Sequence, residues 1–219
     1  ENPGHPMSAS CRFRRIEAAD RIRQLCRSQR HYLKPQILET LHRSLFDCCA
    51  AVRLSILDSL FFLSYDVSLT LIRNLASQET DSPMVKERAE LIARLLESSI
   101  ATPPCTKPIV VVSDNFDLLK RLMVFASQVE SEVRWARPGT PDIIAFPAAI
   151  KIVDPEFVGT TVWDRYVKYL DEANGDNTPL IILGEKYSLK RPRNNTLCNT
   201  AWNYNIIFHF IREHWLQQE

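Results

Sequence analysis

The chain has 219 residues, of which 45% are hydrophobic and 24% charged, and its formal net charge is +1. This composition is typical of a soluble globular protein of one or two domains and excludes wholesale disorder. The near-zero charge provides no overall field toward nucleic acid or an anionic membrane. Its five glycines build neither common glycine-rich phosphate-binding loop.

Cysteine usage and hydropathy both bear on the expected location. The six cysteines form no C-x-x-C pair, so we expect free thiols in a reducing compartment. No apolar run is long enough to cross a bilayer. Residues 1–10 lack the apolar core of a secretory signal and are expected to be a disordered tail. We therefore expect a cytoplasmic protein without a membrane segment.

The region over 11–100 predicts a helical domain. Apolar residues recur at intervals of three and four, which is typical of amphipathic helices. The expected helices cover 16–30, 35–46, 49–63, 67–76 and 83–96. Pro35 suits a first helical turn, and Ser82 or Asp81 is expected to cap the fifth helix.

Two of these helices resemble each other at an offset of 33 residues. Val52-Arg53 and Val85-Lys86 each follow an aspartate by a few positions. This pattern resembles the second helix of a HEAT-type repeat, over about 35–98. The resemblance implies a stacked helical array, because a single helix pair cannot bury its apolar face alone. An irregular helical bundle is the alternative.

A proline-rich segment over 101–108 predicts an extended linker. Beyond it, strands are expected over 109–112, 131–136, 150–153 and 178–183, with a short apolar segment over 142–146. Helices are expected around 118–125, over 162–170 and over 201–215. The last helix is expected to bury Trp202, Ile206, Phe210 and Ile211. This alternation predicts a doubly wound parallel sheet over 109–219.

The order of these elements resembles the receiver domain of response regulators, which has a flavodoxin-like fold. Asp114 matches the second of two acidic residues that follow the family's first strand, and Ser113 stands in place of the first. Asp154 follows the segment over 150–153 and matches the phosphoacceptor. In a competing register, Pro147 takes the acceptor position and phosphorylation is impossible.

The resemblance is incomplete at the other positions of the phosphorylation site. Gly184 replaces the family's Ser or Thr, and Lys190 only approximates the Lys of a late Lys-Pro pair. Lys190 and Lys186 are the candidates for contacting phosphate. An active site would hold Mg²⁺ on Asp114 and Asp154, whereas otherwise we expect no cofactor. A purely structural alternative is that Asp154 caps a loop and that Asp114 caps the following helix or forms an Asx turn before it.

A basic stretch runs from Arg12 to Lys34, with eight cations against Glu17 and Asp20. Its candidate partner-binding residues are Arg12, Arg14, Arg15, Arg21 and Arg23. Such a stretch fits an acidic partner or nucleic acid, and a solvated helix face is the alternative.

These features predict a two-part regulatory protein: a HEAT-like helical array followed by a degenerate receiver-like domain. We expect a signalling adaptor that binds proteins, with a second copy of the chain among the candidates, and that is not an enzyme. One alternative is a working receiver phosphorylated on Asp154 with Mg²⁺. The other is a nucleic-acid-binding regulator that uses residues 12–34, which the overall charge disfavours.

Overall fold

The computed structural model describes residues 7–28, 35–63, 66–100, 108–136, 147–172, 177–184, 187, 189, 195–200 and 203–216. The chain divides into two compact units, Glu1–Glu97 and Ser98–Glu219. None of the helices in the described parts of the chain is both long and apolar enough to span a lipid bilayer.

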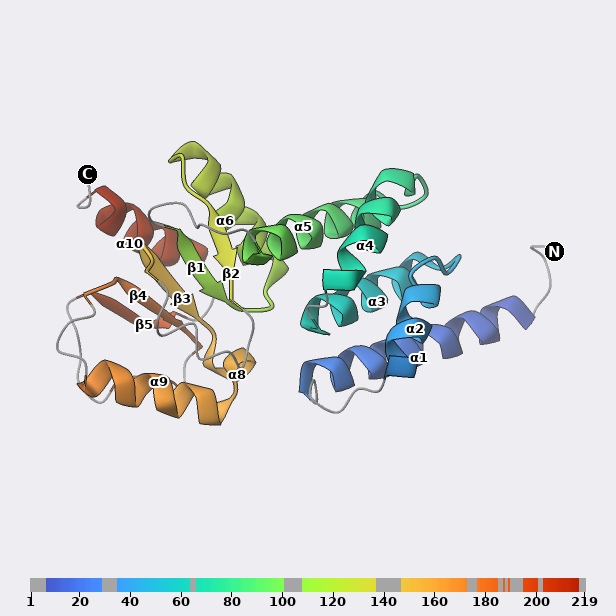
Figure 1. Ribbon diagram of the computed structural model, residues 1–219, viewed down its shortest axis with the longest axis horizontal. Helices are drawn as coiled ribbons and strands as arrows, with labels where there is room; N and C mark the ends of the chain where they lie inside the picture. Colours follow the sequence, from blue (N-terminus) through green and yellow to red (C-terminus); the bar gives the residue numbers. More distant parts are fainter. Residues whose placement is uncertain are drawn as a thin grey trace. The chain divides into compact units, whose positions relative to one another are not determined.

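The first unit is helical, as the sequence predicted (Figure 1). Its helices are α1 (Met7–Ser28), α2 (Pro35–Ser44), α3 (Ala50–Leu63), α4 (Asp66–Gln78) and α5 (Pro83–Ile100). The expectation of a disordered tail over 1–10 is wrong for residues 7–10, because α1 begins at Met7. Residues 1–6 lie outside the described part of the chain.

Helix α3 is the central element of the first unit. Ten of its 14 residues are buried, which explains why its apolar residues surround the helix instead of forming one stripe. Helix α1 packs along α3, and the Ser55 hydroxyl donates to Oδ1 of Asp20 at 2.6 Å. Val52 and Val85, the paired positions of the internal similarity, are both buried.

Side-chain hydrogen bonds and an ion pair connect the remaining helices of this unit. His42 of α2 and Ser68 of α4 lie 2.9 Å apart through Nε2 and Oγ. Arg88 of α5 donates to Asp58 of α3 at 2.6 Å. The Ser82 hydroxyl accepts the Val85 amide at 3.4 Å, so Ser82 is the residue that caps α5.

The second unit is built on a five-stranded parallel sheet in the order β2-β1-β3-β4-β5. The strands are β1 (Ile109–Val112), β2 (Val133–Trp135), β3 (Ile150–Val153), β4 (Leu180–Leu183) and β5 (Thr196–Thr200). Every residue of β1 to β4 is buried, as expected for strands that are covered on both faces. This order is consistent with a flavodoxin-like α/β fold, so the predicted fold class is confirmed at that level.

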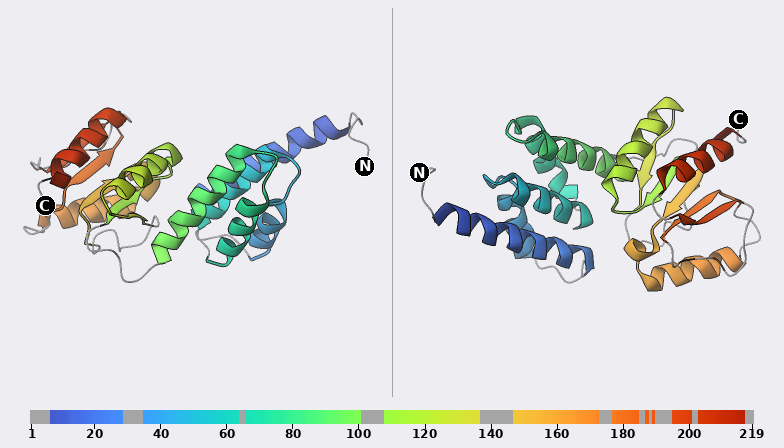
Figure 2. Two further views of the ribbon diagram at one scale, coloured as in Figure 1. Left: turned by 90° about the horizontal axis from the view of Figure 1, so that it is seen from above. Right: turned by 180° about the vertical axis from the view of Figure 1, so that it is seen from behind.

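Helices cover both faces of the sheet. They are α6 (Phe116–Gln128), α8 (Pro155–Val158), α9 (Thr160–Glu172) and α10 (Tyr204–Leu216). In Figures 1 and 2, α6 and α10 lie on one face, whereas α9 lies on the other. The second unit is therefore doubly wound.

Helix α10 buries only part of the stripe that the sequence predicted. Ile211 is fully buried, as predicted, and Ile207 is buried beside it, whereas Ile206 is 46% exposed and Phe210 is half-buried. Trp202 lies outside the described residues. Apolar residues occupy both candidate stripes of this helix, so periodicity alone did not determine which one faces the sheet.

The fifth strand, β5, begins at Thr196, so Lys190 precedes it in the chain. In the receiver family the late Lys-Pro pair stands at the end of the fifth strand, so Lys190 does not take that position. The sequence pattern set no bounds for this strand, because Thr196–Thr200 contains a single large apolar residue, Leu197, and gives little strand signal. No lysine follows β5 in the sequence. The apolar segment expected over 142–146 lies outside the described residues.

Candidate functional site

The carboxyl ends of β1 and β3 bring Asp114 and Asp154 to one edge of the sheet. These strands are neighbours, with Val112 opposite Val153, and the Asp154 amide donates to the Val112 carbonyl at 2.8 Å. Strand β3 ends immediately before Asp154. Pro147 precedes that strand, so the competing register is wrong.

Asp154 is buried and forms the N-cap of α8. Its Oδ1 accepts the amides of Glu156 at 3.0 Å and Phe157 at 3.3 Å, and Pro155 occupies the first helical position. The pKa of Asp154 is raised to about 6. Burial is the main cause and the charge of Asp114 adds to the rise, whereas the hydrogen bond from the Phe157 amide opposes it. Oδ1 of Asp154 is therefore already engaged in capping α8.

Ser113 occupies the position where the receiver resemblance expects an acid. Its side chain is fully buried, its Oγ accepts the Asn115 amide at 3.1 Å, and its carbonyl accepts the Trp135 indole N–H at 3.0 Å. The rings of Trp135 and Phe157 lie 6.4 Å apart. The position is thus adapted to a small hydroxyl, since a carboxylate there would carry an added desolvation cost.

The N-cap of α6 is Asn115, so the expectation that Asp114 caps this helix is wrong. Asn115 Oδ1 accepts the Leu118 amide at 2.9 Å and the Tyr204 hydroxyl at 3.3 Å. Asp114 is half-buried beside this turn. Trp135 and Tyr204 were not singled out from the sequence, because their partners lie 22 and 89 residues away.

Gly184 directly follows β4 and has a φ of +96°. This backbone conformation favours glycine over any residue with a Cβ. Lys186 and Lys190, the candidate phosphate contacts, lie outside the described residues. Among the residues that the structure describes, no group of three or more His, Cys, Asp and Glu side chains is placed to hold a metal ion.

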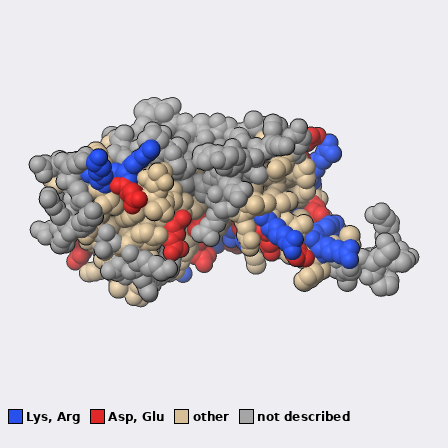
Figure 3. Space-filling view, turned by 90° about the horizontal axis from the view of Figure 1, so that it is seen from below, with Lys and Arg blue, Asp and Glu red and all other residues tan. Residues whose placement is uncertain are grey.

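Three of the five candidate arginines of α1 form ion pairs within the first unit. These pairs are Arg15–Asp47, Arg21–Glu17 and Arg23–Asp58, with N–O distances of 3.1, 2.6 and 3.5 Å. In Figure 3, basic side chains over this unit lie beside acidic ones. The stretch is therefore partly neutralised by its own fold.

The two other candidate arginines differ in their surroundings. Arg14 is exposed. Arg12 lies beside the Cys49 thiol: burial raises the pKa of Cys49, but the Val52 amide and the Arg12 guanidinium outweigh this effect and lower it. Both arginines belong to the first unit.

We compared the chain with known protein families, curated proteins and solved structures. No protein-family model, curated protein or solved structure gives a significant match to the chain. The chemistry of the sheet edge therefore carries the functional interpretation.

Proposed function

We propose that this protein is a non-catalytic signalling adaptor, in which a degenerate receiver-like domain and a HEAT-like helical region bind other proteins. The strand order and the position of Asp154 after β3 support the receiver resemblance. The observation that carries the proposal is that the carboxyl edge of the sheet departs from the receiver pattern. A buried Ser113 stands in place of one acid, and Asp154 caps α8.

The donor set at this edge is poor for phosphoryl transfer. Mg²⁺ prefers several oxygen ligands with close to octahedral geometry, and it must also neutralise the incoming phosphoryl oxygens. Asp114 and Asp154 are the two carboxylates that the resemblance assigns to a metal here, and Oδ1 of Asp154 already accepts two amides. The sequence supplies no lysine after β5 to pair with the phosphate.

One observation favours a second candidate, a working receiver phosphorylated on Asp154. An acidic group whose pKa is raised by burial and a neighbouring charge is typical of functional sites, and the charge of Asp114 contributes to the raised pKa of Asp154. A divalent cation between the two carboxylates would relieve this repulsion. Mg²⁺ binding therefore separates the two candidates.

The test is a Mg²⁺ titration of the ¹⁵N-labelled full chain, followed by NMR. The Trp135 indole N–H is a local reporter, because it donates to the Ser113 carbonyl at the sheet edge. We expect no saturable shift of this signal at millimolar Mg²⁺, with the Trp163 indole of α9 as the internal control. A saturable shift of Trp135 that disappears in the Asp114→Asn variant would favour the working receiver.

A further inference from the structure

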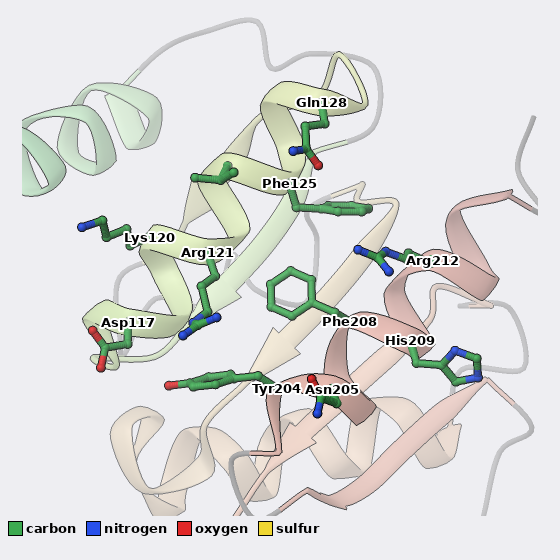
Figure 4. Close-up of a pocket in the computed structure, with 11 residues that line it drawn as sticks. Asp117, Lys120, Arg121, Phe125, Gln128, Tyr204, Asn205, Phe208, His209 and Arg212 are labelled. Carbon is green, nitrogen blue, oxygen red and sulfur yellow. The ribbon is translucent and has the colours of Figure 1, made fainter.

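A groove with a volume of about 810 Å³ lies between α6 and α10, on the outer side of one helical layer (Figure 4). Its α6 wall runs from Asp117 to Gln128, and its α10 wall runs from Tyr204 to Arg212. At 1.5 Å per residue, the α6 wall spans about 16 Å, or three helical turns. The groove is long enough to hold a short helix.

The centre of the groove is aromatic. Phe125 and Phe208 meet edge to face with their ring centroids 6.0 Å apart, and Trp215 contacts Phe125 at 6.1 Å. Figure 4 shows the Phe208 ring pointing into the space between the two helices. Val124, which also lines the groove, is 55% exposed. Phe208 and Val124 therefore offer an apolar contact to a bound molecule, and Phe125, which is buried, supports the Phe208 ring.

Cations border this apolar centre. Lys120 and Arg121 come from α6 and Arg212 from α10, whereas Asp117 is the single acidic residue among the described residues that line the groove. The Arg121 guanidinium lies 4.8 Å from the centroid of the Tyr204 ring, which keeps this cation at the groove. The groove is thus more basic than the chain as a whole, whose net charge is +1.

The apolar centre and basic edges of the groove complement an acidic amphipathic helix better than a second copy of the chain. A helix with an apolar stripe and acidic flanks would place apolar residues on Phe208 and carboxylates beside Arg121 and Arg212. A second copy of the chain, docked by two-fold symmetry, would bring the same cations together because such an interface pairs a surface with itself. Charge complementarity therefore favours a different, acidic partner.

We propose that the groove between α6 and α10 binds an acidic amphipathic helix of a partner protein. This inference rests on the proposed adaptor function and names the chemistry of its partner. One end of the groove adjoins the sheet edge through Tyr204, which donates to Asn115, but none of its lining residues is Ser113, Asp114 or Asp154.

The test is a selection of displayed random peptides, each about 16 residues long and so at least as long as the groove, against the full chain. We expect the enriched peptides to combine Glu and Asp with Leu or Phe at helical spacing. The variants Arg121→Glu and Arg212→Glu should each weaken the binding of a synthetic enriched peptide at least about tenfold. Arg165→Glu is the matched control, because it places the same exposed change on α9, across the sheet.

Several outcomes would overturn the groove assignment. They are a failure to enrich any peptide, enrichment of basic or neutral peptides, and equal binding by the groove variants and the Arg165→Glu control. A concentration-dependent dimer that Arg212→Glu abolishes would also overturn it, because the occupant would then be a second copy. Acidic peptides that instead depend on the helical unit would overturn the groove but leave the adaptor function standing.

Discussion

Arg53 and Glu79 form a buried ion pair that joins α3 to the turn between α4 and α5. Arg53 Nη2 donates to Oε1 of Glu79 at 2.9 Å, Nε lies 2.8 Å from Oε2, and the two side chains are 6% and 3% exposed. Glu79 Oε1 also accepts the amides of Asp81 and Ser82. Arg53 is the cation of the Val-Arg pattern, so the internal similarity of the sequence coincides with a contact between successive helical hairpins.

Removing this arginine should destabilise the helical unit strongly. Arg53→Met leaves the Glu79 carboxylate buried without its cation, and we expect a loss of about 3–5 kcal/mol in the free energy of unfolding. Urea denaturation of the full chain, with hydrogen exchange of the α3 amides, measures the change. Arg73→Met is the control, because the Arg73–Glu97 pair is 57% and 40% exposed and should lose less than about 1 kcal/mol. Equal losses in the two variants would contradict the assigned role.

The raised pKa of Asp154 makes the stability of the second unit depend on pH. The folded-state pKa of about 6 lies above the unfolded value of 3.8. The folded protein therefore binds the proton more tightly, and this contribution is present below the unfolded pKa and is lost as the pH rises through about 6. An ionised Asp154 thus costs stability at neutral pH.

We accordingly expect Asp154→Asn to stabilise the protein at neutral pH by about 1–3 kcal/mol. Asparagine retains a capping oxygen for α8 but carries no charge to desolvate. The gain should disappear at acidic pH, where Asp154 is protonated, and thermal denaturation across this range measures it. Asp164→Asn, at an exposed position of α9, is the control. A gain that does not change with pH would contradict the burial of a charged Asp154.

Replacing Gly184, which follows β4, by the serine of the receiver family should destabilise the second unit. A Cβ at Gly184 would lie 3.6 Å from Cδ2 of Tyr187, an ordinary contact, so the obstacle is the φ of +96° and not lack of space. We expect Gly184→Ser to lower the free energy of unfolding by about 1–2 kcal/mol. Gly159→Ser, at a φ of +90° with no atom within 4 Å of the added Cβ, should cost a similar amount. A neutral Gly184→Ser variant would show that this loop relaxes easily.

The basic stretch of α1 should bind nucleic acid poorly. Arg15, Arg21 and Arg23, three of the eight cations of this stretch, are already paired with carboxylates, which lowers the number of cations that can release counterions from phosphates. We expect no saturable binding of labelled single-stranded RNA by the full chain at physiological salt, measured by fluorescence anisotropy. Tight binding that falls steeply with salt and is lost in an Arg12→Glu/Arg14→Glu variant would instead support the nucleic-acid alternative.

Strong local patterns predicted most of the fold. The β-branched run over 109–112 and the apolar segments over 150–153 and 178–183 indicated three buried strands, and β1, β3 and β4 confirm them. The position of Asp154 after β3 followed from the same pattern. The bounds of β5 could not be predicted because its short, polar segment carries little periodic signal.

The chemistry of the sheet edge depended on contacts that no local pattern reveals. Ser113 bonds to Asn115 and to Trp135, which lies on another strand, and the capping role of Asp154 depends on where α8 begins. The groove between α6 and α10 was not anticipated either, because it requires two helices about 90 residues apart in the chain to lie side by side. Sequence periodicity assigns each helix a buried stripe but not a neighbour.

The most direct test of the central claim is incubation of the full chain with a small phosphodonor and Mg²⁺, followed by intact-mass measurement. We expect the mass to remain unchanged, because Ser113 removes one acidic ligand and Asp154 caps α8. A stoichiometric gain of one phosphoryl group that is lost in the Asp154→Asn variant would contradict a non-catalytic role and establish a working receiver.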